Sequence, residues 1–129
     1  MEKKNKSFSF KARLISFRYA FKGIGHLFKE EHNSWIHLAI TILVIIAGIW
    51  FNLSAPEWLF IIFAIGFVFV AEIFNSAVEN LGDAFSTERI DKIGKSKDLA
   101  AAGVLLSAIV SALIGLIIFI PHLLSKLSI

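Results

Sequence analysis

The sequence predicts an all-α membrane protein: an N-terminal amphipathic surface helix followed by three transmembrane helices, in one membrane domain spanning residues 1–129. Hydrophobic residues make up 57% of the chain, above the roughly 45–50% typical of soluble domains. These residues fall into three long apolar runs, and nearly all basic residues lie beside them. The apolar runs are long enough for helices that cross a hydrocarbon core.

The placement of the basic residues predicts the topology. Every Lys and Arg except Lys126 precedes the first apolar run or lies between the second and the third. Basic residues beside membrane segments mark the cytoplasmic side, so we expect a cytoplasmic N-terminus and an external C-terminus. Nucleic-acid binding is a poor explanation, because these charges flank membrane spans and no reading module is present.

The N-terminal segment, about residues 7–31, reads as an amphipathic helix that lies in the membrane surface. Its apolar residues recur at spacings of three and four, and most of its basic residues fall on the other side. Such a helix buries its apolar face at the headgroup boundary. The alternative is an ordinary helix packed on a core.

The three predicted spans are about residues 35–52, 58–81 and 98–120, and Pro121 is expected to end the third. An external turn at 52–57 and a polar cytoplasmic loop at 86–96 connect them. Small residues recur every fourth position in the third span, which lets helix backbones approach closely in lipid: Gly103, Ser107, Ser111 and Gly115.

Polar residues interrupt the second span. Glu72, Asn75, Glu79 and Asp83 fall in one stripe at 3.6 residues per turn. Acids inside a membrane helix are costly to insert, so the stripe predicts a functional site that must face protein or water. We therefore expect oligomerisation. For Asp83 the alternative of a charge in water at the end of the helix, without a function, stays open.

The stripe has a direction relative to the membrane. Glu72 should lie in the inner-leaflet half, and Glu79 about 10 Å further along, at the cytoplasmic interface. Carboxylates together with phosphate oxygens suit Mg²⁺, and a partly desolvated carboxylate can act as a general base. The Glu30–Glu31 hinge can add a metal ligand and Lys97 can neutralise phosphate charge, so the set suits phosphoryl transfer to a hydroxyl.

The segment from Glu72 to Asp83 resembles the signature E-x-x-N-[ST]-A-[IV]-E-x-x-x-D of the small bacterial diacylglycerol kinase family. Lys97-Asp98, followed by two alanines, is similar to the family's K-D pair before its last span. The segment 18–23 resembles its surface helix. The likeness runs from about residue 16 to residue 120, which is most of the chain.

This resemblance implies a homotrimeric ATP- and Mg²⁺-dependent kinase in the bacterial inner membrane, with composite active sites on the cytoplasmic side. Its products would be a lipid phosphate and ADP. Glu72 would be the general base, and Asn75 would orient the acceptor or the base. Glu79 and Glu31 would bind Mg²⁺ with the nucleotide. The remaining ligand contacts would come from Tyr19, Glu88, Lys97 and Asp98 for the nucleotide, and from Lys11 or Arg13 near the N-terminus.

His37 separates two branches of the family. Enterobacterial diacylglycerol kinases carry an acidic residue there, whereas the pattern Glu31-x-Asn33-x-x-x-His37 resembles a Gram-positive-type branch similar to undecaprenol kinases. Undecaprenol is therefore the favoured acceptor, and diacylglycerol stays open. His37 itself reads as a hydrogen-bonded structural residue or one that faces headgroups.

A non-catalytic transporter or scaffold, whose acids form a proton or cation path, is the alternative function. Such a path should carry acids near the midplane and open to both sides. The polar residues instead crowd the cytoplasmic half, which favours chemistry with a cytoplasmic co-substrate.

Overall fold

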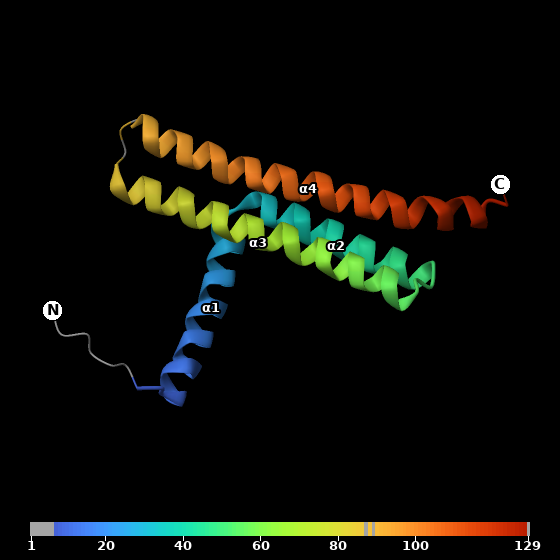
Figure 1. The fold of residues 1–129 in the computed structure, drawn as a ribbon, viewed down its shortest axis with the longest axis horizontal. Coiled ribbons are helices and arrows are strands. Elements are labelled where there is room, and N and C mark those ends of the chain that lie inside the picture. Colours follow the sequence, from blue (N-terminus) through green and yellow to red (C-terminus); the bar gives the residue numbers. More distant parts are fainter. Residues whose placement is uncertain (1–6, 87, 89, 129) are drawn as a thin grey trace.

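The computed structural model describes residues 7–86, 88 and 90–128, which form four α-helices (Figure 1). In chain order they are α1 (Phe10–Glu30), α2 (His32–Trp50), α3 (Ala55–Phe85) and α4 (Asp91–Lys126). The last three are long and apolar enough to cross a membrane. The predicted all-helical fold with three apolar spans is therefore confirmed.

The connections between helices are short. Glu31 is the one residue between α1 and α2. Of the two acids in the predicted hinge, only Glu31 therefore lies outside a helix. The α2–α3 turn is closed by the Leu53 backbone N–H, which donates to the Gly48 carbonyl over 3.1 Å. At the start of α3, the backbone N–H and hydroxyl of Ser54 both donate to Glu57 Oε2.

The helices extend beyond several predicted boundaries. α4 already begins at Asp91, so the loop predicted over 86–96 is shorter than expected. The prediction that Pro121 ends this helix is wrong, because α4 continues to Lys126. Proline removes one backbone donor, a loss that membrane helices tolerate when neighbours hold the chain. Here His122 contacts Glu57 at 2.8 Å, and Lys126 lies over the ring of Trp50 at 5.4 Å.

The main packing interface joins α3 and α4, which run antiparallel side by side (Figure 1). Small residues of α4 lie in it: Ser107 is fully buried, and Ser111 Oγ donates to the Ala64 carbonyl over 3.0 Å. The predicted close approach is therefore seen at Ser107 and Ser111, whereas an added Cβ at Gly103 or Gly115 would meet no atom within 4 Å. α2 also packs against α3, and Leu53, Ile61 and Ile118 form a core near the turn.

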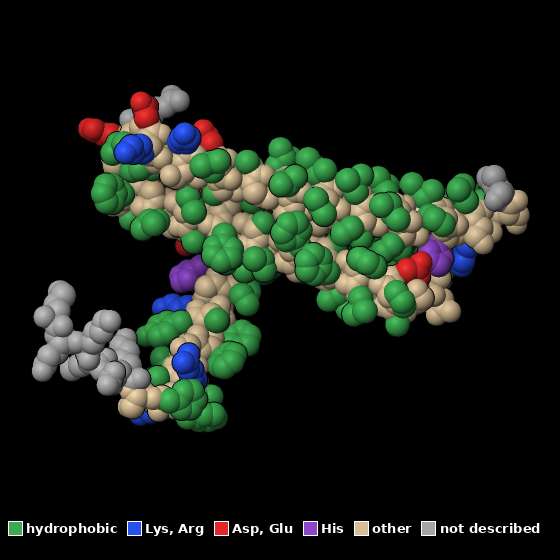
Figure 2. Space-filling model, in the orientation of Figure 1, with side chains coloured by type: hydrophobic (Ala, Val, Ile, Leu, Met, Phe, Trp, Pro, Cys, Tyr) green, Lys and Arg blue, Asp and Glu red, His purple; other side chains and the backbone are tan. Residues whose placement is uncertain are grey.

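Apolar side chains cover the outside of the bundle over most of its length, while charged side chains gather near its two ends (Figure 2). That distribution is the one a lipid-facing surface requires. α1 leaves the bundle at a steep angle (Figure 1). Its placement in the membrane surface stays a prediction.

Candidate active site

Glu72 is the most buried acid of the described chain. Its side chain is 2% exposed, and its Oε1 lies 2.9 Å from His37 Nε2 on α2. The single-residue link before α2 brings the second turn of that helix beside the middle of α3, which pairs two residues 35 positions apart. A buried charge needs such a partner, because desolvation without one is unfavourable.

A second polar group lies about two helical turns from Glu72. Lys97 Nζ on α4 contacts Glu79 Oε2 at 2.9 Å and also donates to Asp83 Oδ1. Asp83, and then Glu79, raise the pKa of Lys97, which precedes the predicted third span. Asp83 is largely exposed, but its ion pair makes it more than a solvated helix end.

Gly82 lets α3 and α4 approach closely at this point. A Cβ atom at position 82 would lie 2.8 Å from Lys97 Cε and 3.0 Å from Ile93 Cγ2. Contacts this short are closer than carbon atoms normally approach. The absent side chain therefore leaves the room in which the Lys97 stem lies.

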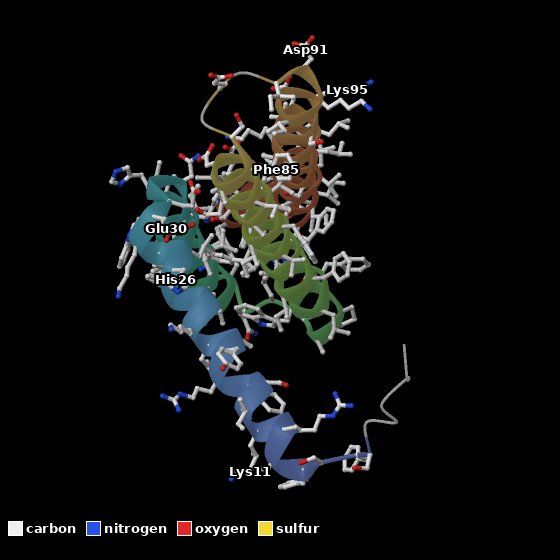
Figure 3. The ribbon with its side chains drawn as sticks, turned by 90° about the vertical axis from the view of Figure 1, so that its left-hand side faces the viewer. Lys11, His26, Glu30, Phe85, Asp91 and Lys95 are labelled. Carbon is white, nitrogen blue, oxygen red and sulfur yellow. The ribbon has the colours of Figure 1, made fainter. Side chains whose placement is uncertain are left out.

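The end of α1 contacts α3 one residue after Glu79, at Asn80. Asn80 Nδ2 donates to Glu30 Oε2 over 3.0 Å, and His26 lies 3.7 Å from Glu30. Figure 3 shows His26 and Glu30 near the end of α1 beside the bundle, with Lys11 at the far end of that helix. The two predicted metal ligands are the chain neighbours of this hydrogen-bonded pair: half-buried Glu31 follows Glu30, and Glu79 precedes Asn80.

Asn75 shows that the predicted stripe divides between two neighbours. Its Oδ1 atom is buried and lacks a hydrogen-bond partner within the described residues. It lies with Ser96 and Gly103 of α4 around a shallow pocket. Glu72 therefore faces α2, whereas the remaining stripe residues face α4.

Two of the other predicted ligands, Tyr19 and Arg13, lie far from these groups along α1 in a single chain. Tyr19 is exposed and lies 11 residues before Glu30, about 16 Å along α1. Arg13 is about 26 Å from Glu30 along the same helix, over the Phe8 ring. Glu88 lies in the α3–α4 connection and Asp98 is exposed on α4. The choice between Lys11 and Arg13 stays open.

An apolar groove of about 250 Å³ leads away from His37. It lies between α2, α3 and α4, with Thr41 and Ser111 as its other hydrogen-bonding side chains. The predicted hydrogen-bonded role of His37 is confirmed, but its partner was missed. The sequence does carry a signal for this pair. An acid and a histidine that each lie inside an apolar run both require a polar neighbour, so they can be expected to pair.

The chain resembles known proteins over most of its length. Residues 18–119 match the model of the family described as prokaryotic diacylglycerol kinase. The chain is 36% identical over 108 residues to the undecaprenol kinase of Bacillus subtilis, an alignment covering 84% of this chain and 88% of that protein.

Two further relatives are diacylglycerol kinases. That of Synechocystis is 33% identical over 113 residues, covering 87% of this chain and 65% of the relative. That of Escherichia coli K12 is 26% identical over 113 residues, covering 82% and 93% respectively. The buried Glu72, the Lys97 cluster and the three apolar helices thus occur in a chain that belongs to the prokaryotic diacylglycerol kinase family and is a lipid kinase.

Proposed function

We propose that this multi-pass membrane protein transfers the γ-phosphoryl group of ATP to the hydroxyl of undecaprenol, at the cytoplasmic face of a bacterial inner membrane. The observation that supports this best is the pairing of two different polar groups on one helix. Glu72 is buried next to an apolar groove, and Glu79 pairs with Lys97 about 10 Å further along α3. A lipid alcohol and a charged nucleotide need these two environments.

The reaction assigns Glu72 to the lipid hydroxyl. Its carboxylate accepts the hydroxyl proton as the oxygen attacks the γ-phosphorus. The bond between that phosphorus and the β–γ bridging oxygen breaks, and ADP leaves with the bond's electron pair. Asn75, whose Oδ1 has no hydrogen-bond partner in the described chain, orients the acceptor from the same helix.

Lys97 and Asp98 would contact the nucleotide, with Lys97 neutralising phosphate charge. Magnesium would be held by Glu79 and Glu31. Mg²⁺ takes one or two carboxylates together with phosphate oxygens and water. Glu79 and Glu31 would supply the two carboxylates; within the described residues no three acids or histidines gather into a metal site. When bound, the ion would neutralise charge on the transferring phosphate.

The groove supports undecaprenol over diacylglycerol. Its lining is apolar apart from His37, Thr41 and Ser111, and the Ser111 hydroxyl is already bonded to the Ala64 carbonyl. A single isoprenoid chain with a terminal hydroxyl needs no other polar partner. The two ester carbonyls of diacylglycerol would find few donors there. The Bacillus relative, named an undecaprenol kinase, supports the same choice.

A homotrimer with composite sites would account for the ligands that one chain leaves apart. Tyr19, Arg13 and Glu88 would then reach a neighbouring subunit's Glu72 and Glu79. Co-assembly tests this: mixed Glu72→Gln and Tyr19→Ala subunits should recover activity that neither variant has alone. Mixtures as inactive as their components would contradict shared sites.

The proposed reaction is tested with purified protein in lipid nanodiscs supplied with Mg-ATP and either undecaprenol or diacylglycerol. Glu72→Gln should lower turnover at least about 100-fold while nucleotide binding is kept. Glu79→Gln should instead weaken Mg-nucleotide binding. Glu57→Gln is the matched control, because Glu57 also contacts a histidine, but at the other end of the bundle. The proposal is wrong if neither lipid yields a lipid phosphate.

A further inference from the structure

His37 is the side chain that defines the surroundings of Glu72. Within the described residues it is the side chain that hydrogen-bonds this carboxylate, at 2.9 Å. Its own side chain is 21% exposed and lines the apolar groove. His37 therefore lies between the buried acid and the space from which a lipid hydroxyl would arrive.

Other charged groups on the neighbouring helices are directed elsewhere. On α4, Lys97 contacts Glu79 and Asp83, and no titratable residue occurs between Asp98 and His122. On α1, His26 lies near Glu30, which accepts from Asn80. Within the described chain, His37 is therefore the titratable side chain in contact with Glu72.

We propose that His37 is a positioning residue for the kinase reaction: it fixes the orientation of the Glu72 carboxylate beside the groove that His37 lines, and it favours the ionised form that accepts the lipid hydroxyl proton. This inference rests on the proposed function, in which Glu72 is the base. The ring donates from Nε2 and keeps that proton throughout, so the hydroxyl proton ends on Glu72. A hydrogen bond to a carboxylate favours its charged form, whereas burial without one favours the neutral form.

The decisive measurement is the pH profile of kcat/KM for undecaprenol at saturating Mg-ATP. In His37→Leu the acidic limb should move upward by at least about one pH unit, because the buried acid has lost its donor. At pH values below the wild-type limb the rate should fall about tenfold or more, and it should recover at higher pH. His37→Gln, whose amide donates without titrating, should keep the acidic limb within about half a unit of wild type.

A matched control removes the chemically similar pair at the opposite end of the bundle. His122 Nε2 lies 2.8 Å from Glu57 Oε1, so His122→Leu should leave the acidic limb unchanged. If His37→Leu fails to assemble, His37→Met replaces it. A second readout independent of turnover is the infrared band of a protonated carboxyl, assigned to Glu72 by its absence when Glu72→Gln is combined with His37→Leu. At a pH between the two acidic limbs, the band should be present in His37→Leu and much weaker in wild type.

An acidic limb in His37→Leu that coincides with wild type would overturn the inference, whatever the absolute rate. So would a shift of equal size in His37→Gln. Failure of the proposed function looks different: Glu72→Gln would then remain active. An inactive Glu72→Gln together with an unshifted His37→Leu would reject the role of His37 alone.

Discussion

Gly82→Ala changes the packing around Lys97 without replacing any charged side chain of the candidate site. The added methyl group would meet Lys97 Cε at 2.8 Å and Ile93 Cγ2 at 3.0 Å. Carbon atoms in contact are normally about 3.5–4.0 Å apart. The Lys97 stem therefore has to move by about 0.7 Å or more to restore an ordinary contact.

That displacement is enough to disturb the ion pairs. Lys97 Nζ lies 2.9 Å from Glu79 Oε2, and a shift of about 0.7 Å away would lengthen this contact beyond hydrogen-bond range. Overall stability should change less, because replacing a helical glycine gains about 1 kcal/mol and overpacking costs about 1–3 kcal/mol. We expect a loss of up to about 2 kcal/mol in the free energy of unfolding.

The expected kinetic signature is a rise of about tenfold in the KM for Mg-ATP, the effect of losing one hydrogen bond to a charged group. The KM for the lipid should stay unchanged. Gly94→Ala is the matched control, because a Cβ there meets no atom within 4 Å. An unaltered KM for Mg-ATP in folded Gly82→Ala would refute the link between close helix approach, Lys97 placement and nucleotide binding.

Two further predictions concern the opposite end of the bundle. Gly48→Ala should lower the free energy of unfolding by up to about 2 kcal/mol, because its Cβ would lie 2.6 Å from the rigid Trp58 ring. Gly66→Ala, where an added Cβ meets no atom within 4 Å, should show no loss. Denaturant titration in micelles compares the two variants, and equal losses would contradict the close-contact argument. At Glu57, the Ser54 backbone N–H and then His122 lower the carboxyl pKa from 4.5 to about 2. The stability that ionised Glu57 contributes is therefore complete above about pH 4.5 and disappears as the pH falls toward 2. Denaturant midpoints of unfolding should fall less over this pH range in Glu57→Gln than in wild type. Parallel curves would contradict the stabilising role of ionised Glu57.

The helices could be predicted from the sequence because their signals are local. Apolar runs gave the three spans, and repeated apolar positions gave α1. The end of α4 could not be predicted, because contacts of His122 and Lys126 with residues more than 60 positions away hold the turns beyond Pro121. Local proline rules do not include such contacts.

The candidate site was predictable in its residue types and less so in its geometry. The positions of Glu72 and Glu79 on one stripe follow from helical periodicity. Which neighbour each residue faces depends on how α2 and α4 flank α3, so the contacts Glu72–His37 and Glu79–Lys97 required the packed structure. The roles of Tyr19, Arg13 and Glu88 stay predictions, since a single chain does not bring them to the stripe.

The tight turn between α2 and α3 also matters for how the chain enters a membrane during synthesis. An acid at the centre of an isolated span costs about 2.5–3.5 kcal/mol to insert, and α3 carries Glu72 deep in its apolar part. The Leu53–Gly48 hydrogen bond closes α2 and α3 into a helical hairpin. His37 is translated before Glu72, so it is already present as a partner for the acid when α3 inserts. The contact with His37 thereby lowers the free-energy cost of inserting Glu72.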